Sequence, residues 1–375
     1  SVVSLAGAPR WNDALLSSGA YKYAPYLRTL DLREALETGT LLYYREGAAG
    51  TVSVRRSGGA LSLAIDGKID ASTGGDMLTQ KLLAHLPLLI HPNPKRVAVV
   101  GLGSGVTAGA ALTHPLERLE IIEISPEVVE ASRLFDTYSG RPLSDPRARL
   151  IVGDARTHFT LKRGDSSRYD VIISEPSNPW MAGVAALFTR EFFEASSARL
   201  ASGGIMCQWA HTYDISDADL RAIVGTFRRV FADTTLWLIG DADLLLIGRL
   251  RAAGDPGAAI ELNFHRAAIA ADLATVNVKS PFSILSLFAG DSVAADKYAG
   301  NTPVETDDRL RLEFRGPRSI VGRSSADNGA ALRAVTRSGG VPPSITAALK
   351  RATAADWASR GAMILDASAA LAYED

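Results

Sequence analysis

The stretch RVAVVGLGSG, residues 96–105, joins a short apolar run to three closely spaced glycines. Its first half has the near-continuous apolar character of a strand that is covered on both faces of a parallel sheet. The glycines of its second half tolerate positive φ and let a ligand approach the backbone beside the start of a helix. This combination is typical of the first unit of a nucleotide-binding α/β sheet, although the glycines alone also fit a plain tight turn.

The apolar strand pattern recurs along the chain after this stretch. Four further runs, LEIIEI, ARLIVG, YDVIIS and GGIMCQW, alternate with helical segments and predict a doubly wound, Rossmann-like parallel sheet. TTLWLIG and DLLLIGR predict an antiparallel pair at the edge of that sheet, joined at DAD, and RLRLEF predicts one late strand. Glycine-punctuated runs before residue 76 predict a small antiparallel β-domain.

Three regions are therefore expected. They are an N-terminal β-rich domain over residues 1–75, a Rossmann-like catalytic domain over 76–322 and a helical C-terminal appendage over 323–375. The formal net charge of −1 gives no electrostatic reason to expect nucleic acid as a partner. The single cysteine, Cys207, excludes an intrachain disulfide and is expected in the core, and the six histidines lack metal-ligand spacing, so no metal site is expected.

Ligands of open parallel sheets bind beyond the carboxyl ends of the strands. The residues at those ends are the glycine loop with Gly101, Gly103, Ser104 and Gly105, and then Glu123, Asp154, Glu175 and Gln208. A carboxylate at Glu123 can accept hydrogen bonds from ribose hydroxyls, and one at Asp154 can accept from an adenine amino group. Each acid alone also fits a solvated strand end, but together and in this order they predict a nucleoside ligand, with Ile124 and Ala155 in the same half-site.

The identity of the nucleoside follows from Val106. The dinucleotide fingerprint requires a small residue at this position, and valine makes close packing against a pyrophosphate doubtful. A glycine loop with acids after the next two strands instead suits an adenosyl sulfonium, which is either S-adenosylmethionine or its decarboxylated form.

The loop SEPSNPW, residues 174–180, follows the fourth apolar strand. Its two prolines prevent it from continuing the strand, and it presents Glu175, Asn178 and Trp180 at the binding edge. Trp209 and Tyr213 follow the fifth strand at the same edge, with core aromatics as the alternative interpretation.

Several of these stretches resemble one known family. HLPLLIHPNPKRVAVVGLGSG, EISPEVVEASR, DPRARLIVGDAR and YDVIISEPSNPW resemble the spermidine synthase family of aminopropyltransferases over about residues 10–320. The motifs STGGDMLTQ, GLGSGVTAGA and SEPSNPWMAG are similar to the spermidine-synthase-like domain that bacterial proteins carry fused to transporter-like membrane helices. The resemblance implies a methyltransferase-like sheet preceded by a β-domain, and a cytoplasmic domain of an inner-membrane protein, with a homodimer as one possible assembly.

The resemblance also implies residue roles. Glu175 stands where the family has the Asp that deprotonates the attacking amine, and Asn178 stands where a second Asp holds the diamine. Ser104 replaces the Asp that contacts the aminopropyl amine, so discrimination between intact and decarboxylated S-adenosylmethionine is relaxed. This sequence departs from the family pattern at further positions. Asp70 stands where the family has a pocket Gln, and Thr79 and Gln80 stand where it has a Tyr-His pair. The expected substrate site consists of Asp70, Asp76, Gln80, Asn178, Trp209 and Tyr213.

The leading hypothesis is aminopropyl transfer from decarboxylated S-adenosylmethionine to a putrescine-like amine, without metal and with release of methylthioadenosine. Ser104 and the lost charge at Asn178 favour a second hypothesis, which is methyl transfer from intact S-adenosylmethionine or its cleavage. A third hypothesis is a non-catalytic nucleoside-sensing domain of a transporter.

Overall fold

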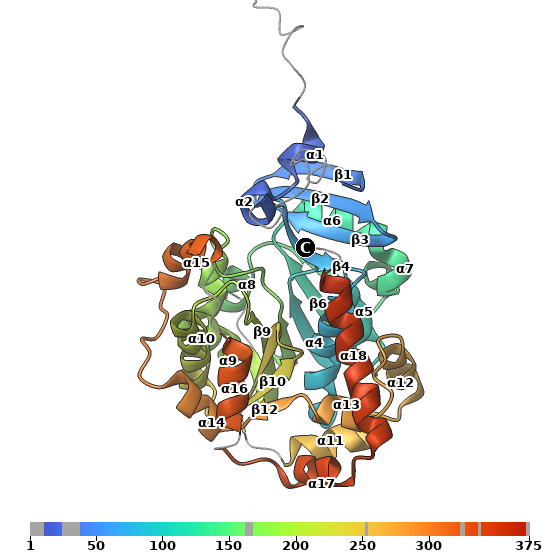
Figure 1. Cartoon of the computed structure of the whole chain (residues 1–375), viewed down its shortest axis with the longest axis vertical. Coiled ribbons are helices and arrows are strands. Elements are labelled where there is room, and N and C mark those ends of the chain that lie inside the picture. Colours follow the sequence, from blue (N-terminus) through green and yellow to red (C-terminus); the bar gives the residue numbers. More distant parts are fainter. Residues whose placement is uncertain are drawn as a thin grey trace, which may run out of the picture.

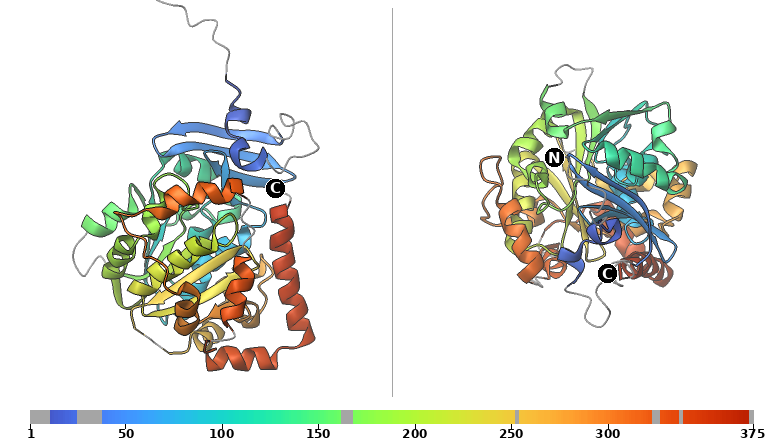
Figure 2. Two further views of the ribbon diagram at one scale, coloured as in Figure 1. Left: turned by 60° about the vertical axis from the view of Figure 1, so that its left-hand side comes forward. Right: turned by 90° about the horizontal axis from the view of Figure 1, so that it is seen from above.

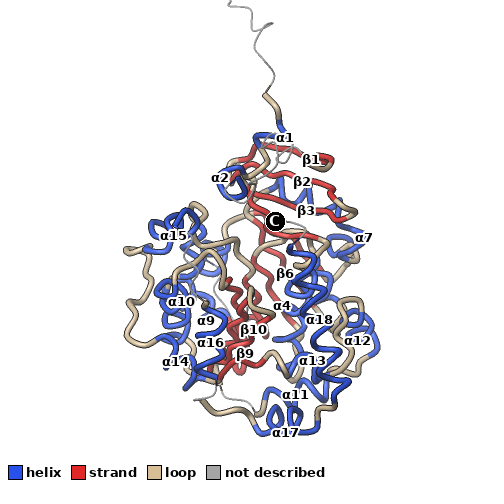
Figure 3. Tube along the Cα trace, in the orientation of Figure 1, coloured by secondary structure: helices blue, strands red, loops and turns tan. Residues whose placement is uncertain are grey.

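The computed structural model describes residues 11–24, 38–161, 168–251, 254–322, 327–336 and 339–372. A small sheet sits above a large sheet that is flanked by helices (Figure 1). Figure 3 shows the same division by secondary structure, with the strands of the large sheet in the middle of the molecule and helices on both sides.

The small sheet is an antiparallel meander in the order β1-β2-β3-β4. Its strands are β1 (Thr40–Gly47), β2 (Gly50–Ser57), β3 (Ala60–Ile65) and β4 (Lys68–Ser72), and the short helices α1 (Asp13–Leu16) and α2 (Ala20–Tyr23) precede them. The predicted β-domain is therefore confirmed. The strand β4 lacks an apolar run and is held by pairing with β3, which leaves its alternating polar residues free to face the large sheet.

The large sheet has the strand order β12-β10-β11-β9-β8-β5-β6-β7. Its strands are β5 (Arg96–Val100), β6 (Arg118–Glu123), β7 (Ala148–Val152), β8 (Tyr169–Ser174), β9 (Leu200–His211), β10 (Asp233–Ile239), β11 (Asp243–Arg249) and β12 (Phe288–Gly290). The five predicted parallel strands pair in parallel as β7, β6, β5, β8 and β9, which confirms the doubly wound α/β fold. The predicted antiparallel pair is β10 and β11, but β12 lies outside β10 and forms the edge.

Helices cover both faces of this sheet. They are α4 (Met77–Ile90), α5 (Val106–Leu112), α6 (Pro126–Ser132), α7 (Asp136–Ser139), α8 (Ala155–Leu161), α9 (Arg190–Arg199), α10 (Asp217–Val230), α11 (Pro256–Asn263), α12 (Ala267–Ala274), α13 (Pro281–Leu285) and α14 (Ser292–Ala299). Alternate residues of β5 enter two different cores: Val97 and Val99 pack on the side of α4 and α5, whereas Ala98 and Val100 pack on the side of α8, α9 and α10. Burial on both faces explains the continuous apolar runs.

The prediction of a late strand from RLRLEF is wrong. The helix α15 (Arg311–Gly322) begins inside this segment, and the Arg311 backbone N–H donates to the buried Glu305 carboxylate at 2.9 Å. The alternation of arginine and leucine suggested a period of two, but this acceptor satisfies a backbone N–H of the first helical turn.

Three helices follow, α16 (Asn328–Thr336), α17 (Pro343–Arg351) and α18 (Ala354–Ala372). Figure 2 shows α18 running along the outside of the molecule from α17 towards the small sheet. Across the described ranges, no helix has both the length and the apolar character needed to cross a membrane.

Candidate active site

A cavity of about 500 Å³ lies between the small sheet and the carboxyl ends of the parallel strands. β3 and β4 form one wall, and the loops after β5, β6, β7 and β8 form the opposite wall. The first residue of β11 and the first turn of α4 also line the cavity. The site predicted for an open parallel sheet is therefore a real cavity with the small sheet as its cover.

The glycine loop has the backbone that its sequence predicts. Gly101, Gly103 and Gly105 adopt φ values of 92°, 50° and 80°. A Cβ at Gly101 would lie 2.7 Å from the carbonyl oxygen of Glu175, so only glycine fits between the two strand ends. The Ser104 hydroxyl is buried and donates to Gln80 Oε1. In this arrangement Ser104 has no proton left to donate to a bound carboxylate.

Glu123 is fixed at the end of β6. Its two carboxylate oxygens accept hydrogen bonds from the backbone N–H groups of Leu102 and Ser125, both at 2.8 Å. Burial raises the pKa of Glu123, and these backbone hydrogen bonds oppose the shift. A carboxylate has about four lone-pair sites, so Glu123 can still accept from ligand hydroxyls. The next acid, Asp154, is exposed at the cavity wall and accepts from the Thr157 N–H at 2.7 Å.

Glu175 lines the cavity directly after β8. Thr107, in the first turn of α5, has its hydroxyl 2.6 Å from Glu175 Oε2. Burial raises the pKa of Glu175 to about 8; the Thr107 hydrogen bond opposes this shift, and the carboxylates of Asp76, Asp243 and Asp70 add to it. Near neutral pH this carboxyl group is therefore poised between its acid and base forms.

Carboxyl groups gather at one end of the cavity, where Asp70, Asp76 and Asp243 lie near Glu175. Asp243 accepts hydrogen bonds from the Thr79 hydroxyl at 2.6 Å and from the Trp209 indole at 2.9 Å. Burial raises the pKa of Asp76 to about 6, and Asp243 adds to this shift. Asp70 is paired with Lys68, whose Nζ lies 2.8 Å from Asp70 Oδ1. We call Asp70, Asp76 and Asp243 the acidic end of the cavity.

The first and last residues of the loop SEPSNPW have different surroundings. Glu175, Pro176 and Ser177 line the cavity, and the Ser177 hydroxyl donates to Asp70. Trp180 does not line the cavity and is buried, with its ring centroid 6.4 Å from that of Tyr21. The loop is thus anchored by Trp180 while its first residues face the site.

Most of the predicted site residues line this one cavity. They are Asp70, Asp76, Gln80, Gly101, Gly103, Ser104, Glu123, Ile124, Asp154, Ala155, Glu175, Trp209 and Tyr213. Gly105 instead caps the start of α5, and Asn178 is fully buried in the SEPSNPW loop; neither belongs to the cavity lining.

Sequence reasoning missed four charged residues of the lining, which are Asp66, Lys68, Arg156 and Asp243. Asp243 begins the antiparallel strand β11, so it lies opposite His211 at the end of β9. The DAD turn was the signal in the sequence that could have located Asp243. The second strand of a hairpin starts at the sheet edge where the first strand ends.

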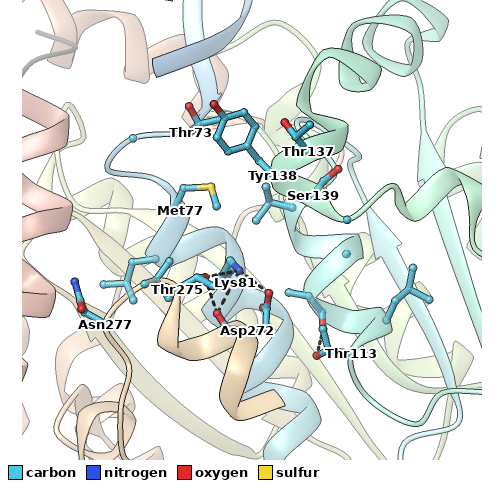
Figure 4. Close-up of a pocket in the computed structure, with 18 of the residues that line it drawn as sticks. Thr73, Met77, Lys81, Thr113, Thr137, Tyr138, Ser139, Asp272, Thr275 and Asn277 are labelled. Carbon is cyan, nitrogen blue, oxygen red and sulfur yellow. Dashed lines mark hydrogen bonds and ion pairs between the residues drawn. The ribbon is translucent and has the colours of Figure 1, made fainter. Parts of the chain in front are cut away.

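A second cavity of about 770 Å³ lies against the opposite face of α4 (Figure 4). Met77, Leu78 and Lys81 of α4 line it, and Lys81 Nζ lies 2.6 Å from Asp272 Oδ1 and 2.8 Å from the Thr275 hydroxyl. It contains none of the predicted site residues. In the described ranges, no group of three or more His, Cys, Asp or Glu side chains is arranged to hold a metal ion.

Comparison with known proteins bears on this geometry. The family model described as the spermine/spermidine synthase domain matches residues 76–239, which run from the acidic end of the cavity to the end of β10. Residues 76–239 are therefore similar to the spermine/spermidine synthase domain. This confirms the family resemblance, whereas nothing in the comparisons bears on a fused transporter.

Two curated relatives illustrate the range of the family. Putrescine N-methyltransferase 3 of Nicotiana tabacum is 35% identical over 170 residues, which are 45% of this chain and 44% of the relative. The spermidine synthase of Dictyostelium discoideum is 36% identical over 155 residues, 40% of this chain and 53% of the relative. The chain thus matches about half the length of these relatives.

Solved structures support the fold. Spermidine synthase from Thermotoga maritima superposes with a TM-score of 0.54 at 18% identity, covering 76% of this chain and 88% of that one. A spermidine synthase in complex with the transition state analogue AdoDATO gives a TM-score of 0.55 at 18% identity, with the same coverage. The methyltransferase-like sheet with a small antiparallel sheet is therefore shared.

Proposed function

We propose that this domain transfers an aminopropyl group from decarboxylated S-adenosylmethionine to an amine and releases methylthioadenosine. The observation that carries the proposal is the position of Glu175 in the cavity. It shares this cavity with the glycine loop and Glu123, which suit an adenosyl group, and with the acidic end, which suits amines and lies close enough to act on its pKa.

The nucleoside half of the cavity supports an adenosyl ligand. Gly101 and Gly103 leave the backbone uncovered by side chains, and Glu123 retains lone pairs for ribose hydroxyls. Ile124 supplies an apolar surface for a base, with 57% of the residue exposed. Asp154 lines the same cavity, and its carboxylate can accept from an exocyclic amino group.

The chemistry requires little from the protein beyond position and a base. The amine nitrogen attacks the methylene carbon next to the sulfonium, and a C–N bond forms. The C–S bond breaks with its electron pair going to sulfur, which becomes the neutral thioether of methylthioadenosine. The surplus proton on the new ammonium passes to the Glu175 carboxylate, whose raised pKa of about 8 makes it a better base than an ordinary glutamate.

One observation favours methyl transfer from intact S-adenosylmethionine as a second candidate. Ser104 places no carboxylate in the glycine loop, and its hydroxyl is held by Gln80. The carboxylate of intact S-adenosylmethionine would therefore meet no fixed anion at this loop. The similarity to proteins named putrescine N-methyltransferase agrees with this candidate.

Product analysis separates the candidates. The protein is incubated with each sulfonium, with and without an amine, and the nucleoside products are identified by mass spectrometry. Methylthioadenosine formed from the decarboxylated sulfonium only when an amine is present supports the proposal. Adenosylhomocysteine indicates methyl transfer, methylthioadenosine without amine indicates cleavage, and no turnover with tight nucleoside binding indicates a sensing domain.

We further propose that the domain is cytoplasmic and tethered to inner-membrane helices elsewhere in its parent protein, and that it pairs as a homodimer. The support for tethering is the resemblance of SEPSNPWMAG and STGGDMLTQ to fused bacterial proteins. The reading frame of the parent gene tests the tether, because a frame without membrane spans contradicts it. Light scattering of the isolated domain tests the dimer.

A further inference from the structure

The acidic end of the cavity contains its own cation. Lys68 is the first residue of β4, and only 3% of its surface is exposed. Its Nζ donates to Asp70 Oδ1 at 2.8 Å, and both residues line the cavity together with Asp76 and Asp243. Lys68 and Asp70 therefore lie on the same side of β4, since their side chains are hydrogen-bonded to each other and line one cavity.

The ammonium of Lys68 acts on more than its hydrogen-bond partner. It opposes the rise that burial causes in the pKa of Asp76 and in that of Asp243. Lys68 is therefore within electrostatic reach of all three carboxylates of the acidic end. Asp70 Oδ2 is buried and has no hydrogen-bond partner within the described part of the chain, so it remains an acceptor for a ligand N–H.

We propose that Lys68 is a specificity-determining residue, whose ammonium takes the place that the far ammonium of a diamine would occupy, so that the preferred acceptor is a monoamine. This inference rests on the proposed function, since it concerns the acceptor of the same transfer.

The balance of formal charge supports a monoamine. The three carboxylates of the acidic end and the one ammonium of Lys68 leave two negative charges. Decarboxylated S-adenosylmethionine brings two positive charges, on its sulfur and on its terminal amine. Asp66, Glu123, Asp154 and Arg156 also line the cavity but are not part of the acidic end. Glu175 takes the proton that the reaction releases, so the acidic end has no surplus negative charge for a second ammonium on the acceptor. A diamine would place that ammonium beside Lys68, where like charges repel.

Another use of Lys68 would be to hold the carboxylate of intact S-adenosylmethionine. The surroundings oppose it, because Asp70 already pairs with Lys68 and the carboxylates of Asp76 and Asp243 would repel a further anion. The geometry therefore favours a Lys68 ammonium that takes the place of the acceptor's second ammonium. It does not favour a Lys68 that binds the carboxylate of the donor.

The test compares two acceptors of equal length, 1-aminobutane and 1,4-diaminobutane, with decarboxylated S-adenosylmethionine as donor. We expect the wild type to have the higher kcat/KM with 1-aminobutane. In Lys68→Met, which keeps the chain length and removes the charge, the ratio should shift towards the diamine by about ten-fold or more, because Asp70 is free to bind the far ammonium. Lys68→Arg should keep the wild-type preference. A wild type that prefers the diamine, or a ratio unchanged in Lys68→Met, overturns the inference.

The matched control is Lys81→Met. Lys81 is another buried lysine, 2.6 Å from Asp272, and it does not line this cavity, so its loss should leave the ratio unchanged. Melting temperatures establish that each variant is folded. If Lys68→Met does not fold, the ratio of the wild-type kcat/KM values for the two amines still tests the inference.

A failure of the proposed function gives a different result. If neither amine is alkylated, calorimetry of the same two amines binding to protein saturated with methylthioadenosine measures the preference directly. Tighter binding of 1-aminobutane supports the role of Lys68 even without turnover, and tighter binding of the diamine contradicts it.

Discussion

Replacing Glu175 with glutamine removes its ability to accept a proton but preserves the length of the side chain and an oxygen for the Thr107 hydroxyl. With a pKa of about 8, roughly one tenth of the wild-type carboxyl is ionised at pH 7 and about nine tenths at pH 9. Wild-type turnover should therefore rise about ten-fold over this interval. A bound sulfonium shifts the rise to lower pH, because a nearby positive charge stabilises the carboxylate.

Glu175→Gln should lower turnover by about 10²–10⁴-fold and remove the rise with pH, while methylthioadenosine still binds. The assay is kcat between pH 6 and pH 9.5, with calorimetry on the same preparation. Glu175→Asp, which keeps a carboxyl group, should retain a pH-dependent rate. A folded Glu175→Gln protein with near-normal turnover refutes the role of Glu175 as the base.

Stability provides an independent check on the same carboxyl group. The folded-state pKa of Glu175 is raised from 4.5 to about 8, so its contribution to folding is fully present below pH 4.5 and is lost as the pH rises to about 8. The melting temperature of Glu175→Gln relative to the wild type should thus increase between pH 5 and pH 8. A constant difference across this range would show that the carboxyl group titrates normally.

Three further substitutions test separate parts of the site. Glu123→Ala should weaken methylthioadenosine binding by about 1.5–3 kcal/mol in calorimetry, since hydrogen bonds to a charged acceptor are lost; unchanged affinity in a folded variant removes Glu123 from the nucleoside site. Asp243→Asn should raise the KM for the amine by about ten-fold without weakening methylthioadenosine binding, and a variant in which only nucleoside affinity falls contradicts its place at the acceptor end. Trp180→Ala should lower the free energy of unfolding by about 3–5 kcal/mol in denaturant titrations, because Trp180 is only 7% exposed; a loss below about 1 kcal/mol shows that the indole does not anchor the loop.

The central sheet could be predicted because burial on both faces leaves a direct trace in the sequence. Residues such as Val97 and Ala98 are adjacent yet enter opposite cores, so the whole strand is apolar. The strand ends then locate the site, since parallel strands bring Glu123 and Glu175 to one edge whatever lies between them in sequence.

The remainder depends on contacts that are distant in sequence. Lys68 faces the cavity because β4 docks over the large sheet, and no local pattern predicts that docking. Asp243 arrives through a hairpin whose strand β11 inserts beside β9. Asn178 was predicted to bind substrate from its place in a motif, whereas its backbone carbonyl closes the turn to Met181 at 2.9 Å and its side chain is buried.

The most direct test of the account follows the transferred carbons. Decarboxylated S-adenosylmethionine labelled with ¹³C in its aminopropyl chain is incubated with the protein and an amine, and the products are analysed by NMR. The account predicts that the label appears in the amine, bonded to its nitrogen, and that the released methylthioadenosine is unlabelled. Label that stays with the nucleoside, or that leaves it at the same rate without an amine, would contradict aminopropyl transfer.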